Sequence, residues 1–283
     1  MEIGRNSCTK DLFDIYTRDF PEVEERITWP GEIVLSLAKE CFLSLMDDAE
    51  VDTGLKNNAR VKLGNIELSL GNYRECLQYF SVIVNPDDPS DIRNADDCEI
   101  DEVVKALLGV SRYYRKFGLK DLQKSLEFAE SALVAAKEDE TEPLSLNEDA
   151  LRAVIKVNVL MGNFTVAHQK TFELSNIVKE LYSNKSVQYQ ELLNWISEIQ
   201  DLVSIQDIES RWYDMMGSFS EGDDSDPETW DSFERLTVTL ADMYKSACLW
   251  DRELALYEKL VNLGRLEDSH VILLRQGKEE SDG

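Results

Sequence analysis

Hydrophobic residues recur at three- and four-residue spacing along almost the whole chain. One such run places apolar side chains at Ile33, Val34, Leu37, Ala38, Cys41, Phe42 and Leu45. This spacing is that of one face of an α-helix, whereas a half-buried strand would alternate apolar and polar residues between turn residues. Runs of that alternating kind are absent from the sequence. The pattern predicts about a dozen helices and no sheet.

Glycine and proline fall between the periodic segments. The chain has only 6 prolines and 13 glycines, and they include Pro30-Gly31, Gly71 and Gly162. Breaks at these places predict antiparallel helix hairpins over residues 55–86, 101–137, 146–183, 187–219 and 228–263. A helix pair over residues 8–50 would open the array, residues 264–275 would form a closing helix, and residues 276–283 would fray. We therefore expect a single all-α domain over residues 1–283, with about five to six hairpins.

One sequence pattern supports the hairpins by recurring at a fixed register. In the first copy it reads Leu63-Gly64, Gly71-Asn72-Tyr73, Cys76 and Phe80. The spacing returns without gaps over residues 154–171 and 240–257, and with a later glycine at Gly118 over residues 108–129. Copies start near residues 57, 101, 148 and 234, so the last gap is about twice the others. That gap is why a further hairpin is expected at 187–219.

These residues resemble tetratricopeptide repeats (TPR). Members of that family pair a large with a small residue in the first helix, then have a turn glycine, an aromatic entering the second helix, and a small residue followed by an aromatic. Gly64 would let the second helix approach closely, and Gly71 and Gly162 suit the turn. The resemblance implies a right-handed α-solenoid whose first helices line a concave groove for an extended peptide or a helix. An unrelated helical bundle is the alternative.

The resemblance also indicates which residues would contact a partner in the groove. They are Asn58, Val61, Asn65 and Leu68 in the first copy, Ala106, Val110 and Tyr113 in the second, Arg152, Lys156 and Val159 in the third, and Val238, Asp242 and Lys245 in the last. Members that bind a chaperone's C-terminal carboxylate have a Lys four residues before an Asn. Here Val61 precedes Asn65 and Leu107 replaces the second Asn. We therefore do not expect this chain to bind the heat-shock chaperone tail.

The charge of the chain narrows the class of partner. Thirty basic against 56 acidic residues give a net charge of -26. This field repels the phosphates of nucleic acid and of anionic membranes, so we expect neither as a direct partner. Three acidic segments, residues 87–102, 138–149 and 221–234, make a basic protein or segment a plausible partner. The same carboxylates could instead serve solubility and complement helix dipoles.

The cysteines and the N-terminus indicate a reducing compartment. The five cysteines, at positions 8, 41, 76, 98 and 248, are odd in number and lack C-x-x-C spacing. Neither a disulfide framework nor a zinc site is predicted, and Cys76 and Cys248 are expected to be small core residues. No apolar signal core or run of 18 apolar residues occurs. The expected subcellular location is the cytoplasm or the nucleus.

No constellation of residues predicts catalysis or a cofactor. His168 and His270 stand about a hundred residues apart without companions for a metal or a catalytic dyad. Phosphate-loop, dinucleotide and nucleophile-elbow motifs are missing, and Pro227 interrupts the calcium-like residues 222–226. The basic and aromatic residues 112–116 are read as a helix end. Trp29, Trp195 and Trp212 are read as core residues.

Three functions remain open from the sequence. The favoured one is a non-catalytic adaptor or scaffold subunit of a multiprotein complex, which binds a partner by the groove or the convex face. The second is an acidic holding chaperone for a basic client such as a histone or a ribosomal protein. The third is an enzyme or small-ligand carrier without a local motif. Oligomeric state and the binding face are left open.

Overall fold

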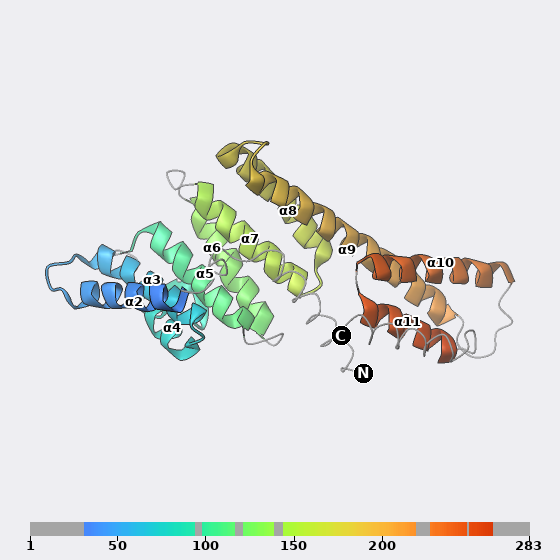
Figure 1. Ribbon diagram of the computed structural model, residues 1–283, viewed down its shortest axis with the longest axis horizontal. Helices are drawn as coiled ribbons and strands as arrows, with labels where there is room; N and C mark the ends of the chain where they lie inside the picture. Colours follow the sequence, from blue (N-terminus) through green and yellow to red (C-terminus); the bar gives the residue numbers. More distant parts are fainter. Residues whose placement is uncertain are drawn as a thin grey trace. The chain divides into compact units, whose positions relative to one another are not determined.

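The chain is predominantly helical in the computed structural model, which describes residues 31–93, 98–116, 121–138, 144–218, 227–247 and 249–262. These residues form ten helices and one two-stranded ribbon (Figure 1). The predicted helical class is confirmed. Contacts divide the chain into two compact units where the sequence predicts one domain. One unit spans Leu12–Ile196, and the other includes the described residues from Ser197 onward.

Three consecutive helix pairs make up most of the first unit. Its helices are α2 (Gly31–Asp47), α3 (Thr53–Ser69), α4 (Tyr73–Phe80), α5 (Ile100–Lys116), α6 (Leu122–Glu138), α7 (Leu144–Leu160) and α8 (Phe164–Tyr182). Each helix contacts the next along the chain from α2 to α8, and α5 also contacts both α3 and α7. The pairs α3–α4, α5–α6 and α7–α8 fall on the segments 55–86, 101–137 and 146–183. The first helices of these pairs therefore lie in a row.

Two of the turns have the same geometry and the same cause. Gly71 and Gly162 have φ values of 79° and 78°, in the left-handed region that favours glycine. After α3, the Gly71 amide donates to the Leu68 carbonyl at 3.2 Å and Asn72 donates to Glu67 at 2.8 Å. After α7, the equivalent bonds from residues 162 and 163 measure 3.0 and 2.8 Å. These are Schellman turns, which satisfy the last carbonyls of each helix and turn the chain back.

The Phe80 side chain fills the space between the first two hairpins. Its ring lies so close to Gly64 and Gly109 that an added Cβ would come within 2.5 and 2.2 Å of ring carbons. Phe80 itself is fully buried. The large-small pairs of the sequence pattern thus make room for an aromatic ring of α4 on both α3 and α5. Glycine is required because any side chain would displace that ring.

A short β-ribbon follows α4, so the prediction of no sheet is wrong. Strand β1 (Val84–Asn85) pairs antiparallel with β2 (Asp88–Ile92), with Val84 opposite Ile92. Ile83 and Val84 are fully buried and anchor the ribbon. Pro86 cannot continue a helix, and the Tyr114 hydroxyl donates to its carbonyl at 2.8 Å. Helix α4, the second helix of this hairpin, is eight residues long and ends at Phe80, before the ribbon begins.

The predicted hairpin at 187–219 is wrong, because α9 (Val187–Ser218) is one helix of 32 residues. No glycine or proline interrupts it before Gly217. Its buried side chains recur at helical spacing along the whole length, namely Leu192, Trp195, Ile199, Leu202, Ile205 and Trp212. A second helix of a hairpin would need a turn signal, and the segment has none before Gly217. The boundary between the two units falls within this helix.

The second unit pairs α10 (Pro227–Ser246) with α11 (Trp250–Asn262). Trp212 of α9 is fully buried, stacks on Phe233 with ring centroids 5.4 Å apart, and donates from Nε1 to the Thr237 hydroxyl at 2.8 Å. The expectation that Trp195 and Trp212 are core residues is confirmed. Residues 8–30 of the opening pair, with Trp29, and the predicted closing segments 264–275 and 276–283 lie outside the described residues.

Candidate protein-binding surface

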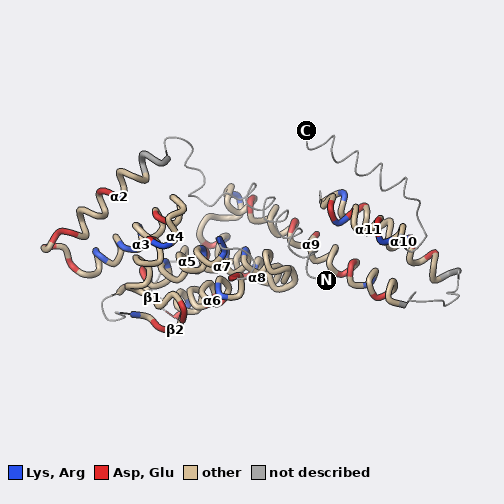
Figure 2. Tube along the Cα trace, turned by 90° about the horizontal axis from the view of Figure 1, so that it is seen from below, with Lys and Arg blue, Asp and Glu red and all other residues tan. Residues whose placement is uncertain are grey.

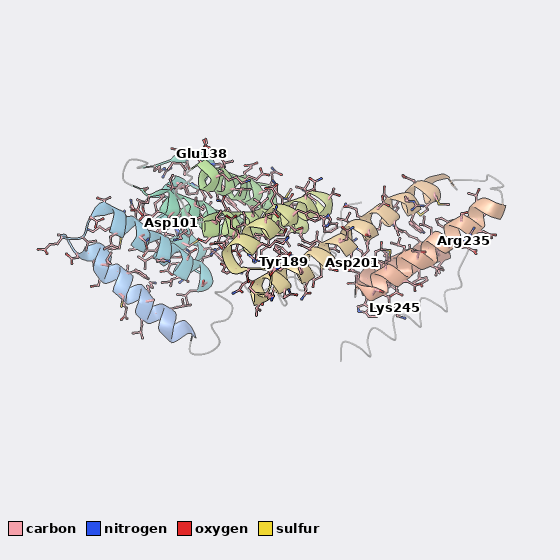
Figure 3. All side chains as sticks on the ribbon, turned by 90° about the horizontal axis from the view of Figure 1, so that it is seen from above. Asp101, Glu138, Tyr189, Asp201, Arg235 and Lys245 are labelled. Carbon is pink, nitrogen blue, oxygen red and sulfur yellow. The ribbon has the colours of Figure 1, made fainter. Side chains whose placement is uncertain are left out.

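One stripe of polar side chains remains outside the core on each first helix of the three pairs. We call these positions together the α3–α5–α7 face. They are Asn58, Lys62 and Asn65 on α3, Asp101, Lys105, Arg112 and Lys116 on α5, and Asp149, Arg152 and Lys156 on α7. Each set follows the three- and four-residue spacing of one helix side, and each residue is exposed or half-buried. Asp101 is labelled in Figure 3.

Side chains join the three helices across this face. The Arg112 guanidinium of α5 donates from Nη1 to Asn65 Oδ1 of α3 at 3.3 Å. Arg112 also attracts Asp149 of α7, as do Arg152 and Lys105. Desolvation nonetheless raises the pKa of the Asp149 carboxyl, although its side chain keeps contact with solvent. A carboxylate in this position is surrounded by protein on several sides while remaining open to a partner.

Two ion pairs lie within helices of the face, one in α5 and one in α7. The Lys105 ammonium lies 2.6 Å from Asp101, and the Arg152 guanidinium lies 2.7 Å from Glu148, both at i,i+4 spacing. The Lys105–Asp101 pair is in contact with solvent, and such i,i+4 pairs contribute about 0.3–0.5 kcal/mol, so it orients side chains more than it stabilises the fold. Glu148 of the other pair is buried. On α8, desolvation raises the pKa of Tyr182, and its interaction with Glu148 adds to that rise.

Five of the predicted contact residues do not reach the surface, and those predictions are wrong. The buried ones are Val61, Leu68, Ala106, Val110 and Val159. Each first helix contacts its partner helix and the first helices beside it, so only a narrow stripe is left to solvent. Alternate positions chosen at helical spacing therefore fall on the core side. These five residues belong to the core beneath the α3–α5–α7 face.

The other predicted positions are accessible. Five of them are half-buried in the first unit, namely Asn58, Asn65, Tyr113, Arg152 and Lys156. Tyr113 lies edge-on to Tyr73, with ring centroids 6.5 Å apart. The predicted residues of the last copy are all exposed on α10 and belong to the second unit; they are Val238, Asp242 and Lys245. Lys245 is labelled in Figure 3.

The predicted contact residues did not include six members of the face, which are Lys62, Asp101, Lys105, Arg112, Lys116 and Asp149. A signal for them was present, because they lie four residues from other positions of the same stripe or continue it by one helical turn. They were overlooked because apolar residues were chosen as contacts in their place. The predicted contact surface mixed apolar and polar residues, whereas the accessible stripe is mainly charged.

The described residues include His168 and the thiol of Cys76. No group of three or more His, Cys, Asp or Glu side chains comes together there in a way that could hold a metal ion. His168 is half-buried with its ring edge-on to Phe172, centroids 4.9 Å apart. Cys76 is a core residue as predicted, and burial raises the pKa of its thiol to about 12. Cys248 and His270 lie outside the described side chains.

The acidic segments are described only in part. Asp87 pairs with Lys124 at 3.0 Å, and the Asp88 carboxylate accepts from the amide and hydroxyl of Ser90.

Arg115 and Lys116 lie in the last turn of α5, as predicted for basic residues that complement the helix dipole. Among the described helices, none is both long and apolar enough to cross a membrane.

Comparison with known proteins leaves the family open. No protein-family model matches the chain, and no curated protein matches it significantly. Among solved structures, the crystal structure of BtubC (BKLC) from P. vanneervenii is similar at 14% sequence identity, with a TM-score of 0.48. The match covers 91% of this chain and 93% of that chain. At this level the likeness carries no argument about fold or function.

Proposed function

We propose that this protein is a non-catalytic adaptor or scaffold subunit with TPR-like helix hairpins, and that it binds a protein partner through the α3–α5–α7 face. The hairpins support the proposal through their repeated glycine turns and through the aromatic ring packed between two large-small pairs. A right-handed solenoid arrangement of the hairpins is part of the proposal. The cytoplasm or the nucleus is the proposed location.

The observation that carries the proposal is the row of three first helices with one accessible stripe each. Their apolar sides are buried in the core, and the stripe gives a partner accessible polar side chains on all three helices. Axes of packed helices lie about 8–10 Å apart, so the face extends about 20 Å across the helices. An extended segment of about six residues spans that width. The size suits recognition of a short segment of a larger protein.

A holding chaperone for a basic client is the second candidate. It rests on the net charge of -26 and on the acidic segments, which would screen the charge of a histone-like or ribosomal protein. Its contacts would be exposed charge pairs, which salt weakens strongly. An adaptor that also buries apolar and hydrogen-bonded contacts would lose its partner less readily. Salt dependence therefore separates the two candidates.

Affinity capture from native lysate tests the proposal. The full chain is compared with a variant that carries Lys62→Glu, Lys116→Glu and Lys156→Glu on the face. A control variant carries Lys185→Glu, Arg211→Glu and Arg235→Glu at exposed positions outside the α3–α5–α7 face, and it changes the net charge equally. Circular dichroism checks that both variants fold. Bound proteins are identified by mass spectrometry at low and at high salt.

The proposal predicts a partner set that the wild-type chain and the control retain at high salt and that the face variant loses. A single very basic protein, released as salt rises, would favour the holding chaperone instead. If all three proteins retain the same partners, the α3–α5–α7 face is not the binding surface. If none retains a partner, the adaptor proposal fails.

A further inference from the structure

Charge is distributed unequally over the helices of the first unit. Helices α3, α5 and α7 together carry nine basic residues, at positions 56, 60, 62, 105, 112, 115, 116, 152 and 156. They carry five acidic residues, at positions 67, 101, 102, 148 and 149. Nine minus five gives a formal charge of +4, in a chain whose net charge is -26. The basic positions of these helices are drawn in blue in Figure 2.

Burial increases the imbalance at the surface. Glu67, Glu102 and Glu148 are buried, whereas all nine basic residues are exposed or half-buried. Lys39 of α2 lies 2.6 Å from Glu67 and neutralises it. Asp101 and Asp149 are thus the acidic side chains that remain accessible on these three helices. The α3–α5–α7 face itself presents six basic and two acidic residues.

We propose that the α3–α5–α7 face binds an extended acidic peptide segment, with Lys62, Arg112 and Lys156 as its main charged contacts. This inference rests on the proposed function and names its partner's chemistry. The three residues lie on three different helices, so a segment that crosses the helices meets one basic residue on each. Asn58 and Asn65 add side-chain amides, which can bind the peptide backbone as donor or acceptor.

The peptide is favoured over nucleic acid on electrostatic grounds. Nucleic-acid binding depends on neutralising many phosphates against the field of the whole molecule, and here that field is strongly negative. Asp101 and Asp149 also lie within the face and would repel a continuous phosphate backbone. A peptide can place its carboxylates only opposite the basic residues. Its recognition therefore needs local complementarity, and the face provides it.

The inferred partner is acidic, whereas the net charge of the chain suggests a basic one. A chain at -26 is expected to attract basic partners, and its acidic segments could do so at other places on the surface. On the α3–α5–α7 face the local charge has the opposite sign. Within about 8 Å, the screening length at physiological salt, local charges outweigh distant ones. The face thus selects an acidic segment even though the molecule as a whole repels it.

Fluorescence anisotropy with the full chain tests this inference. The probe is a labelled peptide of about twelve residues that alternates Glu with Ser, long enough to span the face with free ends. A Lys–Ser peptide of the same length and a single-stranded oligothymidylate serve as comparison probes. The face variant and the equally charged control variant described above are measured beside the wild-type chain. Salt is varied from about 0.05 to 0.5 M.

We expect the Glu–Ser peptide to bind the wild-type chain and the control alike, and to bind the face variant at least about tenfold more weakly. Binding should weaken as salt rises. Tighter binding of the oligonucleotide than of the Glu–Ser peptide, or equal binding of the Glu–Ser peptide by both variants, would overturn the inference. Lack of any acidic-peptide binding would overturn it too. The adaptor proposal is judged separately by the capture experiment, in which a partner without an acidic segment could still depend on this face.

Discussion

Phe80 illustrates how a single side chain links two hairpins. Its ring occupies the volume that a Cβ on Gly64 or Gly109 would need. In an exposed helix, alanine is preferred to glycine by about 1 kcal/mol. At these two positions that preference is reversed, because the neighbour is a fully buried ring with little room to move.

We predict that Gly109→Ala destabilises the protein by about 1–3 kcal/mol, because the new methyl group overlaps the Phe80 ring. Urea denaturation followed by circular dichroism measures the change. Gly217→Ala in α9 is the matched control, since nothing lies within 4 Å of its added Cβ. It should be neutral or stabilising by up to about 1 kcal/mol. Equal effects at the two positions would contradict this account of the Phe80 packing.

Glu102 is a buried carboxylate whose ionisation opposes folding. Its Oε2 accepts a hydrogen bond from the Glu99 amide at 3.2 Å, at the start of α5. Desolvation raises its pKa, and the Glu99 amide opposes that rise only in part. A raised pKa means that the folded protein binds the proton more tightly than the unfolded chain does. The resulting stability is complete below the unfolded pKa of about 4.3 and is lost as pH rises through the folded pKa.

We therefore predict that Glu102→Gln stabilises the protein at neutral pH, since the amide keeps the acceptor oxygen and removes the buried charge. The gain over the wild-type chain should shrink to zero as the pH falls to about 4. Melting temperatures of both proteins across this pH range measure the difference. A gain that stays constant with pH would show that the charge of Glu102 is not its cause.

At the scale of elements, two helices are joined by one buried hydrogen bond. The Trp212 indole of α9 donates to the Thr237 hydroxyl of α10, which itself donates to the Phe233 carbonyl at 2.8 Å. Both side chains are buried. Thr237 is thus placed so that it satisfies the one polar atom of the Trp212 side chain.

We predict that Thr237→Val destabilises the second unit by about 1–3 kcal/mol, because the indole N–H is left buried without an acceptor. The near-equal volume of valine keeps the packing. Thr239→Val is the control, since Thr239 is exposed on the same helix and its hydroxyl donates to the Arg235 carbonyl of that helix. Its effect should stay within about 0.5 kcal/mol in the same denaturation assay. If both variants lose a similar free energy of unfolding, the cause is the helix propensity of valine and not the lost hydrogen bond.

The elements also show how far the sequence pattern can be used. Around Gly71 and Gly162 the pattern predicted turns that the structure contains, because a positive φ depends on the local residue itself. Over 187–218 it predicted a turn that is missing. There the expectation came from the period of the repeat, and the absence of any breaker in the segment outweighs that period. The β-ribbon was not predicted, and one of its contacts, from the Tyr114 hydroxyl to the Pro86 carbonyl, comes from a residue distant in sequence.

At the scale of the whole molecule, self-repulsion is the dominant electrostatic effect. The net charge is -26, and exposed ion pairs such as Lys124–Asp87 and Lys137–Glu173 each contribute little stability. The compact chain concentrates this charge more than the unfolded chain does. Salt should therefore stabilise the folded protein.

We predict that the melting temperature rises when sodium chloride increases from about 0.01 to 0.15 M, because the screening length falls from about 30 to 8 Å. The face variant Lys62→Glu/Lys116→Glu/Lys156→Glu should show a steeper rise, since it carries more negative charge. Differential scanning calorimetry measures both. A melting temperature that falls with salt would show that attractive pairs outweigh the repulsion.

The sequence by itself determined the helical class, the two glycine turns and the small residues that face Phe80. Helical periodicity and the conformational freedom of glycine are properties of short segments, so they can be read locally. Tertiary structure alone decided which stripe of each first helix stays accessible, because burial depends on how many neighbouring helices surround it. It also decided that three carboxylates of these helices are buried while their basic residues are not. The sign of charge on the α3–α5–α7 face is therefore a property of packing, and composition pointed to the opposite sign.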